Sequence, residues 1–180
     1  MSTPLRLHRL FLFGGHNAEE LWPVINTAMF HWALIVFLPK WKHTAKLSLV
    51  IPMILSLLYT ITAMSMAVFP EEGFEGNPDA SFGSLQGIIA LFDDPTALFA
   101  GWLHYIVFDA LVGRWIVLDS TERGASNLFH AVGVVPCLIM TFVLGPMGFL
   151  VYTILIRTLS DAPEAEGEAG PRRGEKAKEN

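Results

Sequence analysis

"GWLHYIVFDALVGRWIVLDS", residues 101–120, is a long apolar stretch in which the ionisable side chains His104, Asp109 and Arg114 are spaced five residues apart. A helix that crosses the hydrocarbon core of a bilayer needs roughly 20 mostly apolar residues, and this stretch has that length. An ionisable side chain at membrane depth costs about 2.5 to 3.5 kcal/mol on insertion scales and usually faces a bundle interior. The stretch therefore predicts a membrane-spanning helix that other helices surround.

The composition of the whole chain is typical of a membrane protein. Of its 180 residues, 52% are hydrophobic and only 16% are charged, and the mean hydropathy is +0.45. A soluble domain usually carries about a quarter charged residues. The net charge of −5 offers no electrostatic support for a nucleic-acid partner. The single cysteine, Cys137, excludes an intramolecular disulfide and a cysteine-based zinc cluster.

Four segments are long and apolar enough to cross a bilayer, so the expected fold is an all-α integral membrane bundle of four transmembrane helices. The segments are residues 21–38, 47–69, 96–118 and 127–156. Asn17 with Glu20 is a capping pair for the first helix, and Asp94 followed by Pro95 starts the third. The fourth segment would be about 45 Å long. It either kinks or breaks at Gly145-Pro146, and we favour one kinked span.

The loops differ in charge, and this difference predicts an orientation. Residues 39–46, "PKWKHTAK", hold three lysines and no acid, whereas residues 70–95 hold six acids and no base. Basic short loops remain on the cytoplasmic side. With four spans, the lysine loop is expected inside and both termini outside. The expected location is an integral multi-pass membrane protein, in the inner membrane if the source is a bacterium.

The two ends of the chain are expected to lie outside the four-span membrane domain. Residues 1–20 form an N-terminal segment whose arginines and apolar patch suit the membrane surface. Residues 159–180 form a charged tail that is nearly free of large apolar side chains, which predicts disorder.

The three ionisable residues of the third span do not share one helix face. At about 100° per residue, Asp109 is turned roughly 140° from His104, and Arg114 a further 140°. Each is therefore expected to meet a different neighbour, and Asn26, His31 and His130 are available on other spans. Trp102 is seven residues before Asp109 and lies on the same stripe of the helix.

Two interpretations of these polar residues stay open at this point. In one, Asp109 is a buried acid paired with Arg114 or a histidine, and it only holds the bundle together. In the other, the intramembrane carboxylate marks a functional site. A metal could be bound by His31, His104, His130 and Asp109. No His-x2-His, His-x3-His or Glu-x2-His pair is present, however, so no metal or cofactor is expected.

The residues that carry a family resemblance are in the third and fourth spans. "LFAGWLHYIVFDALVGRWIVLD" resembles the Trp-x-His…Asp…Arg span of the neoxanthin synthase family, also called abscisic acid deficient four-like proteins. "MTFVLGPMGFLVYTILI" is similar to the apolar stretch of that family that ends in a Pro-x-Gly turn. The resemblance covers most of residues 20–157. The matching positions are Trp102, His104, Asp109, Arg114, Pro146 and Gly148.

The resemblance implies a small four-span membrane protein. It also implies a reaction, since plant members of the family are tied to the isomerisation of violaxanthin to neoxanthin. The hypothesis that follows is an isomerase of a carotenoid or other isoprenoid epoxide in the bilayer. Asp109 would be the catalytic base, His104 the general acid, and Arg114 would orient the acid or bind polar oxygen. Candidate substrate-binding residues are Trp102, His31, His130 and Trp115.

The alternative is a protein without catalytic activity, either a membrane assembly factor or a polar-lined permeation or transport component. In that case His104, Asp109 and Arg114 satisfy one another and lock the bundle. The partners expected under either hypothesis are the lipid bilayer and, for the isomerase, an apolar isoprenoid-like substrate. Oligomerisation is left open.

Overall fold

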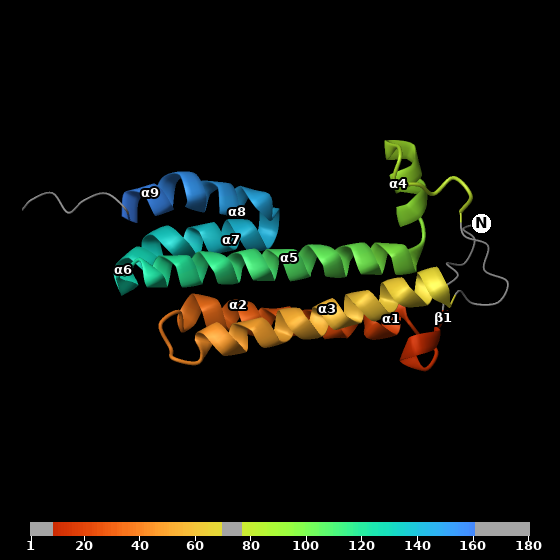
Figure 1. Cartoon of the computed structure of the whole chain (residues 1–180), viewed down its shortest axis with the longest axis horizontal. Coiled ribbons are helices and arrows are strands. Elements are labelled where there is room, and N and C mark those ends of the chain that lie inside the picture. The colour runs from red at the N-terminus through yellow and green to blue at the C-terminus, as the bar shows by residue number, and fades with distance from the viewer. Residues whose placement is uncertain (1–8, 70–76, 161–180) are drawn as a thin grey trace, which may run out of the picture.

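The computed structural model describes residues 9–69 and 77–160, and in this part of the chain the protein is a bundle of helices with one minimal strand pair (Figure 1). The elements in chain order are β1 (Arg9–Leu10), η1 (Phe11–Phe13), β2 (His16–Asn17), α1 (Ala18–Leu21), η2 (Trp22–Thr27), α2 (Ala28–Phe37), α3 (Thr44–Val68), α4 (Leu85–Phe92), α5 (Pro95–Glu122), α6 (Asn127–Phe129), η3 (His130–Val134), α7 (Val135–Leu144), α8 (Pro146–Val151), η4 (Tyr152–Ile156) and α9 (Arg157–Ser160).

Four of the helices are long and apolar enough to cross a membrane, which confirms the expected fold class. They are Ala18–Phe37, Thr44–Val68, Pro95–Glu122 and Asn127–Leu144. Both predicted N-terminal caps are present. The Asn17 side chain accepts a hydrogen bond from the Glu20 backbone N–H at 3.0 Å, and Asp94 accepts from the backbone N–H groups of Thr96 and Ala97.

The described part of the N-terminal segment folds back on itself before the first span. β1 and β2 pair antiparallel, with Arg9 opposite Asn17 and Leu10 opposite His16. Leu10 is buried, which ties this turn to the bundle. The expectation that the segment lies at the membrane surface stays a prediction, and residues 1–8 and the charged tail from residue 161 lie outside the described residues.

A proline inside α3 explains why His31 is buried. Pro52 has no N–H, so the carbonyl of Ser48, four residues earlier, loses its helical donor. The Nδ1 atom of His31, on α2, donates to this carbonyl at 2.8 Å. An unpaired carbonyl in hydrocarbon would cost several kcal/mol. This bond therefore gives the Ser48 carbonyl a donor and also joins α2 to α3.

α5 is the central helix of the bundle. It packs against α2, α3, α4, α7 and α8. Half of its most apolar 18-residue window is buried, against 28% to 33% in the other three spans. The third span is therefore surrounded by neighbours, as its ionisable residues predict.

The fourth span differs from the single kinked helix over 127–156 that the sequence favours. The chain reverses at Gly145, and α8 returns alongside α7 (Figure 1). Pro146 supplies the reason, because its ring disfavours a helical conformation of the preceding residue. Gly145 instead adopts φ 55° and ψ −105°, a conformation that glycine tolerates without penalty.

This reversal changes the expected orientation of the C-terminal side. The end of α9 lies at the same end of the bundle as α6 and as the connection between α2 and α3 (Figure 1). Arg157 therefore joins the lysines of residues 39–46 instead of lying at the opposite side. The expectation that both termini lie outside treated residues 127–156 as one span, whereas the described chain reverses within this segment at Gly145. The orientation stays a prediction.

The return helix is fixed to α5 by one carboxylate. Oδ2 of Asp119 accepts a hydrogen bond from the Tyr152 hydroxyl at 2.8 Å and from Nε of Arg123 at 2.9 Å. Nε of Arg157 lies 3.4 Å from the same oxygen. Tyr152 is 1% exposed, so its hydroxyl depends on this partner.

We expect Asp119→Asn to destabilise the fold by about 2 kcal/mol, since removing one member of a partly buried ionic network leaves its partners uncompensated. Thermal unfolding of the detergent-solubilised protein measures this loss. Glu122→Gln is the matched control, because Glu122 is exposed in the same last turn of α5. Equal unfolding temperatures for the two variants would contradict the assigned role of Asp119.

Candidate functional site

The candidate site is a pocket at the middle of α5, where Asp109 faces the first span and the end of α7. Its volume is about 150 Å³. It is lined by Ile25, Asn26, Ala28, Met29, Trp32, Tyr105, Ile106, Asp109 and Phe142. The walls are mostly apolar or aromatic, and the polar groups come from three side chains. Such a combination is typical of a small-molecule site, where a few polar groups orient an apolar ligand.

The carboxylate of Asp109 is shielded from bulk lipid but incompletely bonded. The residue is 8% exposed. Its Oδ2 is buried and has no hydrogen-bond partner among residues 9–69 and 77–160. Buried polar atoms are almost always paired, and an exception calls for an explanation. A ligand that donates a hydrogen bond, or gives up a proton, to this oxygen would provide one.

The turn between α7 and α8 lies close to Asp109 and Tyr105, two of the residues that line the pocket. A Cβ atom built on Gly145 would lie 2.9 Å from Oδ1 of Asp109 and 3.4 Å from Cε2 of Tyr105. The turn therefore leaves no room for a side chain at position 145 beside the carboxylate. Because Asp109 lies near the middle of α5, the tip of the hairpin also ends at mid-depth of the bundle (Figure 1). Irregular backbone at this depth is tolerated where protein buries it, and Gly145 is buried.

Tyr105 and Asn26 are the polar neighbours of Asp109 in the pocket. Tyr105 lies one helical turn before Asp109, and its hydroxyl donates to the Val143 carbonyl at 3.3 Å. Asn26 lies in η2, which precedes α2. It lines the pocket and is exposed. The i,i+4 spacing of Tyr105 and Asp109 was a usable sequence signal for the first contact. The Asn26 contact depends on how the first span is rotated.

An aromatic row leads from the acidic end of α5 to the pocket. The rings of Trp22 and Trp102 stack at 6.4 Å between centroids, and Trp102 lies 5.5 Å from the ring of Tyr105. Trp22 is 46% and Trp102 44% exposed. Since the α7–α8 hairpin stops at mid-depth, it leaves this half of α5 uncovered on that side. The row is therefore open to lipid.

The other two predicted catalytic residues do not join Asp109. His104 is exposed on another face of α5, where its ring lies 5.8 Å from Tyr59 and 4.6 Å from Phe108. Arg114 donates from Nη2 to the Ala45 carbonyl of α3 at 2.8 Å. The fan of 140° steps expected from helix geometry accounts for this separation, and each of the three residues has a different neighbour.

The remaining predicted binding residues have contacts within the bundle. His31 bonds to the Ser48 carbonyl as described, and Nε2 of His130 bonds to the Val36 carbonyl at 3.1 Å. Trp115 packs on Tyr152 and lies under the Arg157 guanidinium, 5.8 Å from its ring centroid. Of the predicted site residues, only Asp109 lines the pocket, and Trp102 lies in the aromatic row that leads to it.

Metal ligands are not clustered in the described part of the chain. No group of three or more His, Cys, Asp or Glu side chains within residues 9–69 and 77–160 is arranged to hold a metal ion. His31, His104 and His130, which could have shared a metal with Asp109, instead have the separate neighbours given above.

Comparison with known proteins gives one match. A family model described as ABA DEFICIENT 4-like matches residues 21–152 of the chain. The matched segment contains the whole Asp109 pocket and the Gly145 turn. No curated protein and no solved structure matches the chain.

Proposed function

The chain belongs to the ABA DEFICIENT 4-like family, and from this we propose that it is an intramembrane isomerase that acts on a carotenoid or other isoprenoid epoxide. The observation that carries the proposal is the position of Asp109. The Asp109 side chain lines a mostly apolar pocket at mid-depth of the bundle, and its buried Oδ2 is unpaired within the described residues. A substrate dissolved in the bilayer reaches such a pocket without passing through water.

The shape of the approach favours a long, flat, apolar substrate. The row formed by Trp22, Trp102 and Tyr105 offers stacked ring faces from the acidic end of the bundle toward Asp109. Conjugated chains pack well on aromatic faces. The pocket itself holds only about 150 Å³, so it accommodates one end of such a molecule, while the remainder lies along the row in the lipid.

The chemistry requires a base and a proton donor close together. Asp109 removes a proton from the carbon next to the epoxide, and the epoxide C–O bond breaks as a new carbon–carbon π bond forms. The Tyr105 hydroxyl protonates the released oxygen, and Asn26 orients it through its amide N–H. Asp109 then returns its proton to Tyr105. One proton moves from carbon to oxygen overall, so the step is an isomerisation that needs no oxidant or reductant.

In this assignment Asp109 keeps its expected role as the base, and Tyr105 replaces His104 as the acid. Tyr105 and Asp109 line the same pocket, whereas His104 stands on a lipid-exposed face with Tyr59 and Phe108. Arg114 is held on the Ala45 carbonyl and so supports the packing of α3 on α5.

We expect Asp109→Asn to lower product formation by at least about a hundredfold, the usual minimum contribution of a general base. Membranes that contain each variant are incubated with violaxanthin, and the pigments are separated by chromatography. Tyr105→Phe is expected to lower the rate by a smaller factor, because water or Asn26 can still support the oxygen. Asp93→Asn, an exposed aspartate in the acidic connection, is the matched control with wild-type conversion.

The stability of the same variants separates catalysis from bundle packing. Asp109→Asn removes a charge from an apolar site without changing its shape, so its unfolding temperature should equal or exceed that of the wild type. Loss of folded protein would instead favour the assembly-factor alternative. Conversion unaffected by Asp109→Asn, or lost equally on His104→Gln, contradicts the site assignment. A wild type that converts no epoxide contradicts the activity.

A further inference from the structure

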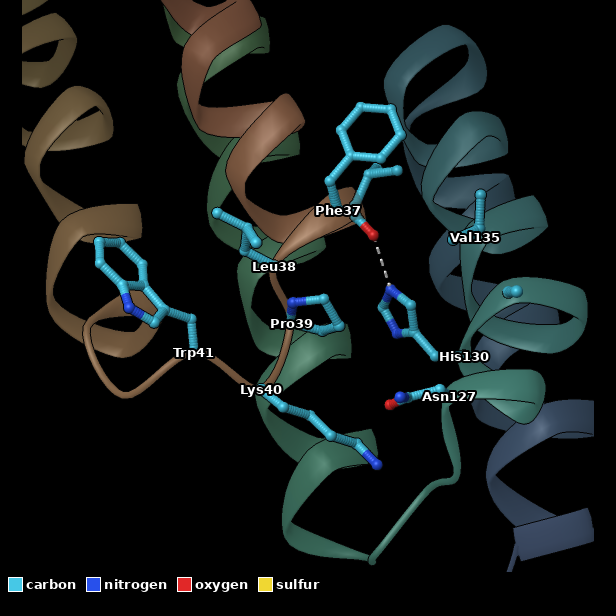
Figure 2. A pocket seen from close by; sticks show the side chains of 10 residues that line it. Phe37, Leu38, Pro39, Lys40, Trp41, Asn127, His130 and Val135 are labelled. Atoms are coloured by element: carbon cyan, nitrogen blue, oxygen red, sulfur yellow. Dashed lines mark hydrogen bonds between the residues drawn. The ribbon is translucent and has the colours of Figure 1, made fainter.

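A second and larger pocket lies at the other end of the bundle, at the connection between α2 and α3. Its volume is about 570 Å³, within the usual range for ligand sites of about 300 to 1,000 Å³. It is lined by Val36, Phe37, Leu38, Pro39, Lys40, Trp41, Asn127, His130, Ala131 and Val135. Figure 2 shows the pocket between this connection and the start of the fourth span. None of the lining residues belongs to the Asp109 site.

The pocket combines apolar walls with one cationic and one amide side chain. Lys40 and Asn127 come from opposite walls, and their side chains point toward one another (Figure 2). The lysine ammonium offers three N–H donors and the asparagine amide two. Among the residues that the structure describes, none that lines the pocket is acidic. The polar part of the site is therefore suited to an anion, and the remainder to hydrocarbon.

The two walls are held in place by hydrogen bonds to backbone carbonyls. The connection turns tightly through hydrogen bonds from the Trp41 N–H to the Leu38 carbonyl at 3.2 Å and from the Thr44 N–H to the Trp41 carbonyl at 2.9 Å. On the other wall, His130 donates from Nε2 to the Val36 carbonyl at 3.1 Å, as drawn in Figure 2. This bond satisfies a carbonyl at the C-terminal end of α2 and fixes the distance between the walls.

The position of the pocket identifies the kind of anion. Its lining residues belong to the end of the bundle where the lysine-bearing connection between α2 and α3 and helix α9, which begins at Arg157, both lie (Figure 1). Trp41 is 43% exposed beside it, as expected of a tryptophan at a membrane–water interface, and the apolar Phe37 is 77% exposed. Basic groups at such an interface attract anionic lipids.

We propose that this pocket binds the phosphate-bearing headgroup of an anionic membrane phospholipid. Lys40 pairs with the phosphate, and the Asn127 amide donates to a headgroup oxygen. The first carbons of the acyl chains lie against Phe37, Ala131 and Val135. The lipid links the α2–α3 connection to the start of the fourth span. The hydrogen bond from His130 to the Val36 carbonyl joins the same two parts of the protein.

The test is native mass spectrometry of the purified full chain in detergent, titrated with phosphatidylglycerol or with phosphatidylcholine. We expect the wild type to retain phosphatidylglycerol preferentially. Lys40→Gln should weaken that retention about fivefold, the effect of one basic side chain at the surface of an anionic membrane. Lys42→Gln is the matched control, since Lys42 is exposed in the same connection but does not line the pocket. Ala131→Trp, which fills the pocket, should also lower retention.

Several results would overturn the proposal. If Lys40→Gln and Lys42→Gln lower phosphatidylglycerol retention equally, the lipid is attracted by the overall positive charge of this end of the bundle and not by the pocket. Retention unchanged by Ala131→Trp would place the lipid elsewhere. If inorganic phosphate at the same concentration displaces phosphatidylglycerol completely, the site takes a free anion and the lipid assignment fails. Because every arm measures bound lipid, these outcomes do not depend on the proposed isomerase activity.

Discussion

Gly148→Ala is expected to prevent the α7–α8 hairpin from closing and to give the largest loss of stability among the substitutions considered. A Cβ atom at this position would overlap Oγ1 and the backbone N of Thr141 and the Cys137 carbonyl oxygen. Two of these atoms belong to backbone, which cannot rotate away. Forcing extra atoms into a packed site costs about 1 to 3 kcal/mol even where side chains can adjust, so we expect more than about 3 kcal/mol here. Thermal unfolding of the detergent-solubilised protein measures it.

Gly133→Ala is the control for this prediction. Gly133 is a buried helical glycine in η3, which leads into α7, but a Cβ atom there would meet its nearest neighbour, Cγ2 of Ile156, at 3.6 Å. That is ordinary van der Waals contact, and alanine has the higher helix propensity. We expect Gly133→Ala to be neutral or slightly stabilising. If Gly148→Ala unfolds at the same temperature as Gly133→Ala, the close approach of the two backbones is not required for the fold.

The number and approximate limits of the spans could be predicted because bilayer thickness sets a minimum length for an apolar run. The first three predicted spans agree with the observed helices to within four residues at each end. The caps at Asn17 and Asp94 were readable because local side-chain bonds determine them. Both signals depend only on residues that are near one another in the sequence.

The hairpin could not be decided in the same way. Gly145-Pro146 is compatible with a kink and with a reversal, and the choice depends on whether α8 finds a surface to pack against. That surface is the backbone of α7 near Thr141, which α8 can approach closely because Gly148 has no side chain. Helix α4 was missed for a related reason, since "LQGIIALF" is too short to span a membrane and lay within a connection identified by its charge.

The candidate site was predicted in part. Asp109 was identifiable because a carboxylate in an apolar run is costly anywhere. The expectation that His104, Asp109 and Arg114 act together came with the isomerase hypothesis, whereas their spacing on a helix already predicted a different neighbour for each. Asn26 reaches the pocket from another span, and only the tertiary arrangement of α5 and the first span brings it beside Asp109.

Gly145→Ala is expected to abolish conversion of the epoxide while the protein still folds. Alanine at φ 55° and ψ −105° is strained by about 1 to 3 kcal/mol. Its Cβ would lie 2.9 Å from Oδ1 of Asp109, the end of a side chain that can rotate. The Asp109 carboxylate therefore rotates away from the new methyl group. The rotation relieves the clash but moves the base out of the position that proton removal requires. A displacement of about 1 Å at a reacting group can cost a hundredfold in rate.

Gly124→Ala separates backbone strain from the effect on Asp109. Gly124 also has a positive φ, 77°, but no atom lies within 4 Å of a Cβ built there. It ends α5 at the basic side of the bundle, far from the pocket. Both variants should lose stability, yet only Gly145→Ala should lose product formation in the violaxanthin assay. Equal product formation by the two variants would show that the Gly145 turn does not position the Asp109 carboxylate. The proposed catalytic role of Asp109 would then not depend on the α7–α8 hairpin.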